Sequence, residues 1–450
     1  MAINNLDAQE TNYDVCVIGL GYVGLTLGIA LCDVGLKVLG IEKNVQVVED
    51  LKSGKPHFSE VGIEPSLQRV LKSGLLAIHN KFEPTHVSQH YIITVGTPLN
   101  NKGVPRLDFI ERAAKEVYAQ LKPEDTVIVR STVSIGTTNN VIRKILNKKN
   151  ISFNLAMCPE RTLEGNAMQE LRLLPQIIGS DDLKSQEACE KLFKLLTNTT
   201  VVVSSCEAAE VIKLADNTYR DVTFAFGNEI ARICEAVGVG ANEVISAGKF
   251  GYSRTNIAMP GLVGGPCLEK DPHILMHSVK KYGLDIEIAK ASRLVNERLP
   301  EEIVAQIKEL SRDRFNTEGT RIVLAGIAFK GVPATDDIRG SMALKVLEHL
   351  HIKFKKPSIT LFDPVIDPKT MSELFFQYKI CNSFEEAIKG VDILIIANNH
   401  PSLGQYHPRN IIEKMNEKAF IFDVWNHFPN SDNIKYLDCY FPFGSVKFLS

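Results

Sequence analysis

Two short stretches of the sequence combine residue types that could do chemistry. The first places three glycines in the spacing Gly-x-Gly-x-x-Gly directly after an apolar run that predicts a strand. Such glycines let backbone N–H groups approach a pyrophosphate and let the next helix pack on the strand. A glutamate ends the following predicted strand, where its carboxylate would bind an adenosine ribose and disfavour a 2′-phosphate. These features predict a site for NAD rather than NADP, built by Gly19, Gly21, Tyr22, Val23, Gly24 and Glu42.

The second stretch runs from Gly261 to Asp271 and is rich in glycine up to Cys267. Glycines let the backbone crowd a ligand, and backbone N–H groups and a nearby lysine stabilise a thiolate at the start of a helix. Cys267 is therefore a candidate nucleophile. The alternative is a buried structural cysteine, which is the commoner role of a free thiol. A dinucleotide site and a charged Lys270-Asp271 pair in the same chain favour the nucleophile.

Three further loops each follow a predicted strand: Thr94–Pro98, Ser131–Val133 and Cys158–Gly165. In an open α/β sheet the loops after the strands form the ligand-binding edge, so their polar side chains are expected beside the cofactor. Hydroxyl groups that only cap loops are the alternative for the first two. In the third loop, Glu160 is either a general base or a solvated surface carboxylate.

The elements that must position these residues form two α/β regions around a helical middle. Short β-rich runs alternate with amphipathic stretches in both regions, which predicts parallel, doubly wound sheets. The predicted strands are Tyr13–Ile18, Lys37–Ile41, Tyr91–Val95, Thr126–Arg130, Phe153–Met157, Thr200–Val203, Arg321–Phe329, Ser358–Phe362, Val391–Ala397 and Ala419–Val424. One helical stretch, Glu207–Val237, would span about 45 Å at about 1.5 Å per residue. We expect it to bridge two domains or to build a subunit interface.

Composition limits the class of protein. The chain has 450 residues, which indicates about three domains, and its net charge of −2 with 44% hydrophobic residues argues against disorder and a general nucleic-acid binder. No apolar run is long enough for a membrane helix and the N-terminus is polar, so a cytoplasmic protein is expected. The nine cysteines are scattered, which predicts reduced thiols. No metal is expected, because the histidine pair His273 and His277, which could face one metal from a helix, lacks the glutamate of a zinc-protease helix.

The sequence resembles the UDP-glucose/GDP-mannose dehydrogenase family of nucleotide-sugar 6-dehydrogenases over nearly its whole length. The resemblance rests on Val17–Gly24, Gly96–Pro98, Ser131–Val133, Pro159–Glu160, Lys213–Asn217, Cys267–Asp271, Gly326–Lys330 and Thr335–Ser341. It implies an α/β protein of two Rossmann-like domains joined by a long central helix, assembled as a homodimer or a larger homo-oligomer. The expected domains are 1–203 for NAD binding, 204–300 for dimerisation and catalysis, and 301–450 for the nucleotide sugar.

The resemblance also implies a reaction, the oxidation of a sugar C6 alcohol to a carboxylate with two NAD. Cys267 would capture the intermediate aldehyde as a thiohemiacetal, which becomes a thioester and is hydrolysed. Lys213 and Asn217, four residues apart on one helix, would stabilise the oxyanion at C6. Asp271 would orient Lys213 or a water molecule.

Other roles implied by the family concern hydrolysis and binding. Thr132 would hold the water and Glu160 would be the base that activates it. The expected cofactor contacts include Thr97, Ser131, Thr132 and Lys270. The expected contacts to the nucleotide sugar are Glu160, Arg161, Glu164, Lys213, Asn217, Arg254, Gly264, Phe329 and Lys330, with Arg254 reaching a neighbouring subunit's site.

Departures from the family pattern bear on the sugar. Arg161, where UDP-glucose enzymes usually carry Phe, and Arg254 indicate the UDP-N-acetylhexosamine branch, whereas Lys270 points the other way. Pro266 matches neither branch, and Trp425 stands where many members have a basic residue. We therefore predict a UDP-N-acetylhexosamine (UDP-GlcNAc or UDP-ManNAc) 6-dehydrogenase of polysaccharide precursor synthesis. The alternatives are a UDP-glucose 6-dehydrogenase, a two-electron hydroxyacid dehydrogenase and a dinucleotide-dependent sensor without turnover.

Overall fold

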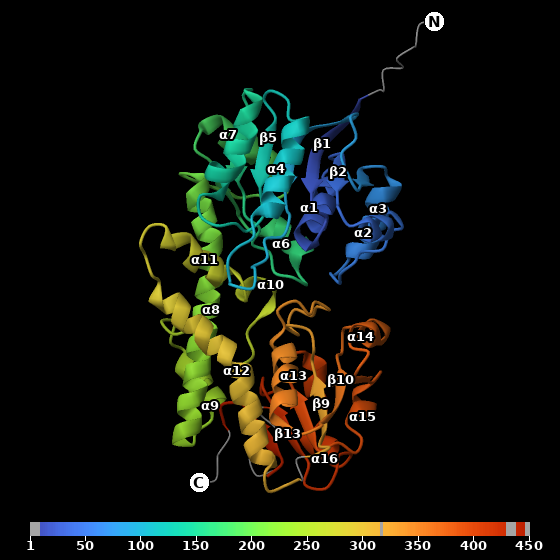
Figure 1. The fold of residues 1–450 in the computed structure, drawn as a ribbon, viewed down its shortest axis with the longest axis vertical. Helices are drawn as coiled ribbons and strands as arrows, with labels where there is room; N and C mark the ends of the chain where they lie inside the picture. Colours follow the sequence, from blue (N-terminus) through green and yellow to red (C-terminus); the bar gives the residue numbers. More distant parts are fainter. Residues whose placement is uncertain (1–9, 316–317, 429–437, 446–450) are drawn as a thin grey trace, which may run out of the picture. The chain divides into compact units, whose positions relative to one another are not determined.

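The computed structural model describes residues 10–315, 318–428 and 438–445 (Figure 1). The chain divides into two compact units. The first comprises the chain up to Asp216 together with His273–Asp285, and the second comprises Asn217–Pro272 and the chain from Ile286 onward. The domain limits expected from the sequence, at 203/204 and 300/301, stay predictions.

The first unit is built on an eight-stranded sheet in the order β3-β2-β1-β4-β5-β6-β7-β8. Its pairs are parallel except β6 with β7, which are antiparallel, so the expectation of a wholly parallel sheet is wrong at that point. The strands are β1 Thr11–Ile18, β2 Val38–Ile41, β3 Leu76–His79, β4 His86–Ile93, β5 Thr126–Val129, β6 Asn154–Met157, β7 Gln176–Gly179 and β8 Thr200–Val203.

Helices cover both faces of this sheet, as alternate residues of β1 show. Val15 and Val17 belong to one buried apolar cluster, whereas Cys16 and Ile18 belong to another on the opposite face. Burial on both faces is typical of doubly wound sheets. The helices are α1 Tyr22–Asp33, α2 Val45–Lys52, α3 Ile63–Lys72, α4 Asp108–Gln120, η1 Thr138–Arg143, α5 Lys144–Leu146, η2 Asn147–Lys149, α6 Ala167–Leu173 and α7 Leu183–Phe193.

The second unit contains a six-stranded parallel sheet in the order β11-β10-β9-β12-β13-β14. Its strands are β9 Arg321–Ala325, β10 Ser358–Phe362, β11 Lys379–Ile380, β12 Ile393–Ile396, β13 Phe420–Asp423 and β14 Tyr440–Pro442. Its helices are α9 Ala241–Lys249, α10 Gly265–Leu268, α12 Glu287–Ser311, α13 Met342–Lys353, α14 Pro368–Leu374, α15 Phe384–Ala387, η3 Pro401–Gly404 and α16 Pro408–Ile412. The predicted fold class, with two Rossmann-like sheets, is confirmed.

Two helices contain residues of both units. The long helix α8 runs from Cys206 to Val237, close to its predicted bounds, and α11 spans Asp271–Lys280. In the second unit, α12 continues through Pro300, where we expected the third domain to begin. None of the helices in the described ranges is long and apolar enough to cross a membrane.

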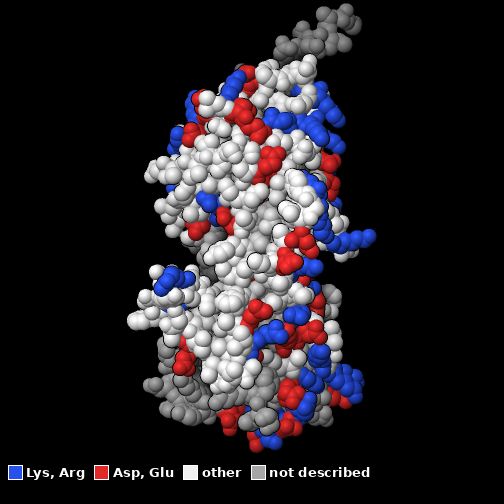
Figure 2. Space-filling model, turned by 90° about the vertical axis from the view of Figure 1, so that its left-hand side faces the viewer, with Lys and Arg blue, Asp and Glu red and all other residues white. Residues whose placement is uncertain are grey.

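One face of α8 in the second unit carries exposed apolar side chains. Tyr219, Phe226 and Ile233 recur every seven residues and are 68%, 50% and 56% exposed. Residues spaced by seven lie on one side of a helix, so these side chains form a stripe. Ile288 and Leu294 of α12 are also exposed. Figure 2 views the side of the molecule that carries these helices and shows mostly uncharged residues there.

Candidate active site

The turn between β1 and α1 has the geometry of a dinucleotide site. Gly19 has φ of +94°, a value that side chains other than glycine rarely adopt. A Cβ on Gly24 would lie 1.9 Å from the Gly19 carbonyl oxygen, so only glycine fits there. A Cβ on Gly21 would meet nothing within 4 Å, which leaves space over the start of α1. The helix begins at Tyr22, so its free N–H groups face the position that a pyrophosphate would take.

Glu42 follows β2 and points its carboxylate back to this turn. One oxygen accepts from the backbone N–H of Leu20 at 2.9 Å, and the other accepts from Asn44 at 2.9 Å. These two bonds fix the carboxylate at the edge where the ribose of a bound dinucleotide lies. The residues present therefore fit NAD.

The loop hydroxyls expected beside the cofactor also bond within their own loops. Thr97 is buried and its hydroxyl donates to the carbonyl of Thr132, while the hydroxyl of Ser131 donates to the carbonyl of Val95 at 2.7 Å. Such bonds are those of loop capping, the alternative considered from the sequence. Contact of these residues with the cofactor, and the role of Thr132 in holding water, stay predictions.

Glu160 lies in a buried ion pair with Arg130, the residue after β5. Arg130 donates to Glu160 from two nitrogens, with Nε to Oε2 at 2.9 Å, and to the side chain of Gln176 at 2.8 Å. The other oxygen of Glu160 accepts from the N–H groups of Arg161 and Thr162. Burial alone would raise the pKa of this carboxyl, but Arg130, the Thr162 N–H and the charge of Lys213 outweigh it and lower the pKa. Because this lowered pKa weakens Glu160 as a base, the structure favours a fixed, ionised carboxylate.

The remaining predicted residues of the first unit lie around this pair. Arg161 donates to the carbonyl of Pro175 at 2.8 Å and pairs with Asp216 at 3.6 Å. Lys213 is buried on α8. Glu164 is half-buried at the end of the loop. Their contacts with the sugar stay predictions.

Cys267 differs from the other cysteines of the chain. All nine are free and lie in the described ranges; seven are buried, Cys439 is partly buried and Cys267 is exposed. It lies on the short helix α10, which begins at Gly265 and has Pro266 in its first turn. Around it the backbone is tightly packed, since a Cβ on Gly265 would lie 2.3 Å from the ring of Phe329. The structure thus removes the alternative of a buried structural cysteine.

Asp271 holds two of the predicted residues together in the second unit. Its carboxylate is fully buried and accepts from the Asn217 amide at 2.6 Å and from the Lys270 ammonium at 2.5 Å. Burial alone would lower the pKa of Lys270, but the charges of Asp271 and Cys267 outweigh it and raise the pKa. Lys270 therefore stays protonated and places a positive charge near Cys267. Its expected contact with the cofactor stays a prediction.

The predicted nucleotide-sugar residues of the second unit divide into two groups. Gly264, Phe329 and Lys330 lie together near α10. A Cβ on Gly264 would lie 2.2 Å from the Gly340 carbonyl. The Lys330 ammonium lies 5.3 Å from the centre of the Phe329 ring. Arg254 is exposed, with its guanidinium 4.8 Å from the ring centre of Tyr252.

Trp425 fills the position where a basic residue is common in the family. Its indole N–H donates to the carbonyl of Ala397 at 3.0 Å, and its ring lies against Gly261, whose Cβ would be 2.8 Å away. The side chain is therefore used in packing the glycine-rich segment.

Sequence reasoning missed residues that hold the site from behind. Arg130 directly follows the buried strand β5, and Arg293 lies in the buried stripe of α12 between Ala289 and Asn296. A basic residue within an otherwise buried pattern is the signal that would have found both, because such a charge is buried only with a partner.

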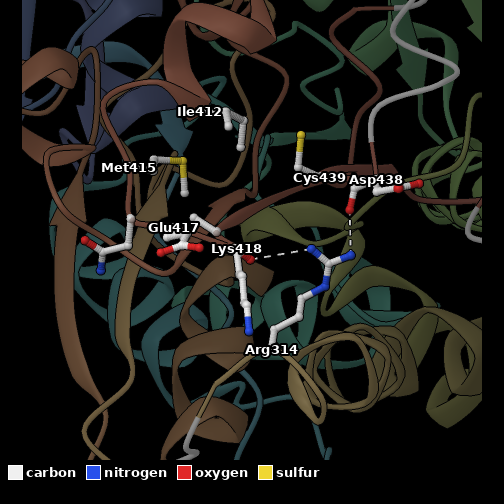
Figure 3. A pocket seen from close by; sticks show the side chains of 9 residues that line it. Arg314, Ile412, Met415, Glu417, Lys418, Asp438 and Cys439 are labelled. Carbon is white, nitrogen blue, oxygen red and sulfur yellow. Dashed lines mark hydrogen bonds between the residues drawn. The ribbon is translucent and has the colours of Figure 1, made fainter.

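A hollow of about 380 Å³ lies away from these residues (Figure 3). Arg314 crosses it and donates to the carbonyl of Asp438, and Met415 and Cys439 line it. It lies at the amino ends of β13 and β14, whereas ligands of parallel sheets bind at the carboxyl ends.

One group of possible metal ligands exists in the described ranges, formed by His79, Glu83 and His86. The backbone N–H of Glu83 donates to Nδ1 of His86 at 3.2 Å, which leaves the ring proton on Nε2, the nitrogen that faces Glu83. This arrangement opposes a metal there.

Comparison with known proteins identifies the family. The profiles of the UDP-glucose/GDP-mannose dehydrogenase family match residues 13–197 (NAD binding domain), 207–298 (central domain) and 323–430 (UDP binding domain). The chain is 31% identical to a UDP-N-acetyl-D-mannosamine dehydrogenase of Pyrococcus horikoshii, over 90% of this chain and 94% of the relative.

Two solved structures share the fold over nearly their whole lengths. A UDP-D-ManNAc dehydrogenase from Pyrococcus horikoshii gives a TM-score of 0.85 with 29% identity, covering 97% of this chain and 99% of that one. A UDP-glucose dehydrogenase from Pyrobaculum islandicum gives 0.84 with 25% identity, covering 99% and 100%.

The fold and the site are those of an NAD-dependent dehydrogenase of nucleotide sugars. They combine a dinucleotide turn in one sheet, a second Rossmann-like sheet and an exposed cysteine beside a lysine. The chain belongs to the UDP-glucose/GDP-mannose dehydrogenase family. It is an oxidoreductase that uses NAD and acts on a nucleotide sugar.

Proposed function

We propose that the protein oxidises the C6 alcohol of a UDP-N-acetylhexosamine, UDP-N-acetyl-D-mannosamine first among these, to the uronate with Cys267 as the nucleophile. One observation supports this most: Cys267 is the exposed thiol, beside the protonated Lys270 and the buried Asp271–Asn217 pair. A simple two-electron dehydrogenase needs no such thiol. The uronate would serve the synthesis of a polysaccharide precursor.

The residues divide the reaction into steps that balance. When bound, NAD accepts one hydride from C6 in each of the two oxidations. The Cys267 sulfur adds to the aldehyde carbon, and the carbonyl electron pair moves to the oxygen, where Lys213 and Asn217 would bind the oxyanion. Loss of the second hydride leaves a thioester, and addition of water breaks the C–S bond and returns the thiol. The sum converts one alcohol, two NAD⁺ and one water into a carboxylate, two NADH and three protons.

The role of Glu160 follows from its ion pair. Because Arg130 keeps the carboxylate ionised, it accepts hydrogen bonds and donates none, which suits a sugar hydroxyl or the attacking water. In this proposal Glu160 orients the water for thioester hydrolysis, and its action as a base is limited by its lowered pKa.

The choice of sugar rests on the relatives. Several are UDP-N-acetyl-D-mannosamine dehydrogenases, and Arg161 and Arg254 agree with that branch. UDP-glucose is the second candidate, because the UDP-glucose dehydrogenase of known structure fits the chain almost equally well.

The test is to count the NADH formed per molecule of a limiting sugar. We expect two NADH with UDP-ManNAc, and little reaction with UDP-GlcNAc or UDP-glucose. Cys267→Ser should abolish uronate formation and leave NAD affinity unchanged, with Cys439→Ser as the matched control at a partly buried thiol. One NADH per sugar, or full activity of Cys267→Ser, would refute the mechanism; two NADH with UDP-glucose alone would change the substrate.

We propose further that two copies of the chain associate through the stripe of Tyr219, Phe226 and Ile233 on α8. Large apolar side chains exposed along one side of a helix are typical of an interface. Phe226→Glu should convert the dimer to a monomer in analytical ultracentrifugation, whereas Lys345→Glu at an exposed position of α13 should not; a wild-type monomer would refute the proposal. The enzyme would act in the cytoplasm, where reducing conditions keep Cys267 as a thiol.

A further inference from the structure

The segment Gly261–Leu268, here termed the cysteine loop, is held from behind by a buried polar network. Four side chains of α8 and α12 form it, and none is more than 1% exposed. These side chains are Asp221, Asn228, Arg293 and Asn296.

Arg293 is the centre of this network. Its Nη1 donates to the carboxylate of Asp221 at 2.6 Å and to the carbonyl of Leu268 at 2.7 Å, and its Nη2 donates to the carbonyl of Val263 at 3.4 Å. One guanidinium thus binds the backbone on both sides of Cys267. Only a planar, forked donor can reach two carbonyls and a carboxylate together.

Asn228 fixes the beginning of the cysteine loop. Its Oδ1 accepts from the N–H of Gly261 at 2.9 Å, and its Nδ2 donates to the carbonyl of the same residue at 3.2 Å. Asn296 joins this clamp to the ion pair, because its Oδ1 accepts from Asn228 at 3.0 Å and its Nδ2 donates to Asp221 at 2.9 Å. The network is therefore continuous from Gly261 to Leu268.

The opposite side of the loop is held by the backbone of Gly340 and by the side chains of Phe329 and Met342. The N–H of Gly265 donates to the carbonyl of Gly340 at 2.8 Å, and there is no room for a Cβ on Gly264 or Gly265. With the loop fixed on both sides, Cys267 is its exposed residue. The backbone that carries Cys267, and with it the position of the Cys267 Cβ, is thus fixed from both sides.

A buried ion pair adds little to stability, since well-packed apolar residues would often serve as well. Its value here is geometric, because the loop carbonyls are buried acceptors that need donors. We propose that Arg293, with Asn228, is a positioning residue that holds the Cys267 thiol where it captures the aldehyde. This inference rests on the proposed role of Cys267 as the nucleophile.

If the Cys267 thiol is displaced, the aldehyde intermediate escapes from the enzyme, and this escape can be measured. Capture by the thiol competes with release, so a displaced sulfur lowers the NADH yield per sugar without blocking the first oxidation. A shift of about 1 Å in a reacting group can cost about 100-fold in rate. Loss of stability alone would lower the amount of active enzyme but would leave the yield per sugar at two.

Two variants test the proposal in the full-length enzyme. Arg293→Lys keeps a charge beside Asp221, but its ammonium cannot span the carbonyls of Val263 and Leu268. Asn228→Ala removes both bonds to Gly261 without a change of charge. The control is Arg232→Gln, which breaks another α8–α12 ion pair, with Glu302 at 3.8 Å, that is partly exposed and does not run to the loop.

Each protein is incubated with limiting UDP-ManNAc, excess NAD and semicarbazide, and NADH and the semicarbazone of the aldehyde are measured. Wild type and Arg232→Gln should give two NADH per sugar. Arg293→Lys and Asn228→Ala should give fewer than two, with about tenfold or more semicarbazone, while NAD affinity is unchanged. If Arg293→Lys does not fold, the result for Asn228→Ala alone tests the positioning role.

Two NADH per sugar in the folded variants would overturn the positioning role. The Cys267→Ser enzyme separates this outcome from failure of the proposed function. If Cys267→Ser also gives two NADH, the nucleophile itself is wrong. If it gives fewer while Arg293→Lys and Asn228→Ala give two, the nucleophile stands and only the positioning role fails.

Discussion

Six strands of the first sheet, β3-β2-β1-β4-β5-β6, and the six strands of the second, β11-β10-β9-β12-β13-β14, have the same order. In both sheets a glycine of positive φ comes after the first strand, Gly19 at +94° and Gly326 at +89°. A carboxylate after the neighbouring strand then binds the backbone beyond that glycine. Glu42 does so in the first sheet and Asp363 in the second.

The two turns differ in the length of chain between the glycine and the next helix. In the first, α1 begins at Tyr22 and presents its N–H groups, whereas in the second α13 begins only at Met342. The longer second turn contains Phe329, Lys330 and Arg339. We therefore expect the first turn to offer backbone to the dinucleotide and the second to offer side chains to the nucleotide sugar. This contrast predicts that glycine substitutions impair NAD binding most, and charge substitutions impair sugar binding most.

The largest effect is expected at Gly24. An alanine Cβ would lie 1.9 Å from the Gly19 carbonyl oxygen, and such overpacking costs about 3 kcal/mol, or about 100-fold in affinity. Gly24→Ala should weaken NAD about 100-fold in calorimetry, with binding of the UDP-sugar unchanged. Gly28→Ala on the same helix is the control, because its nearest neighbour would be 3.8 Å away. Equal NAD affinity in both variants would contradict the role of the turn.

Lys330 tests the second turn. A hydrogen bond to a charged group contributes about 2 kcal/mol, so Lys330→Met should raise KM for the UDP-sugar about 30-fold and leave the KM for NAD as it is. Lys345→Met on α13 removes an exposed lysine that pairs with Glu348 and should change neither constant. An unchanged KM for the sugar in Lys330→Met would show that side-chain charge does not bind the nucleotide there.

The carboxylates of Glu42 and Asp363 should differ in what their loss impairs, NAD binding in the first case and stability in the second. Glu42→Ala should weaken NAD binding about 30-fold, since one hydrogen bond to a charged group contributes about 2 kcal/mol, and should leave the fold intact. Asp363 accepts from the N–H groups of residues 327, 328, 365 and 366, so Asp363→Ala should lower the melting temperature instead. The measurements are the NAD affinity by calorimetry and the melting temperature of both variants. If Glu42→Ala lowers the melting temperature as much as Asp363→Ala does, the difference between the two carboxylates is refuted.

The smallest effect concerns Glu210, a fully buried carboxyl of α8 in the first unit. Burial raises its pKa from 4.5 to about 7, despite bonds from Thr138 and Gly136. The folded protein therefore holds a proton that the unfolded chain has lost above pH 4.5, so stability is full below that pH and falls as the pH rises through 7. Relative to Glu210→Gln, wild type should lose about 5 °C of melting temperature between pH 5 and pH 8. If the melting temperatures of wild type and Glu210→Gln change equally with pH, the raised pKa of Glu210 is refuted.

Much of the fold can be predicted from local patterns. Thr200–Val203 and Ser358–Phe362 are strands with the predicted bounds. The strand predicted to end at Phe329 ends at Ala325, because Gly326 turns the chain although the apolar run continues. The strand Gln176–Gly179 was missed, since it pairs antiparallel with its neighbour and thus breaks the βαβ rhythm. Patterns predict elements well where apolar runs and turns coincide.

The site can be predicted from the sequence only in part. The glycine turn and Cys267 are visible because their residue types are unusual at that spacing. The ion pair of Arg130 with Glu160 joins residues 30 positions apart, and that of Arg293 with Asp221 joins residues 72 apart. Such partners depend on how strands and helices meet, which no local pattern contains. The family resemblance was confirmed, and the roles of individual residues stay predictions.

The unbroken course of α8 has a consequence for the length of the sequence. Lys213 and Asn217 lie one turn apart on this helix, and each residue advances a helix by about 100°. Insertion of a single residue between them would turn every later side chain of α8, Asp221 and Asn228 included, away from its partners. Homologous sequences should therefore have neither insertions nor deletions in this turn, so the spacing is as constrained as Lys213 and Asn217 themselves.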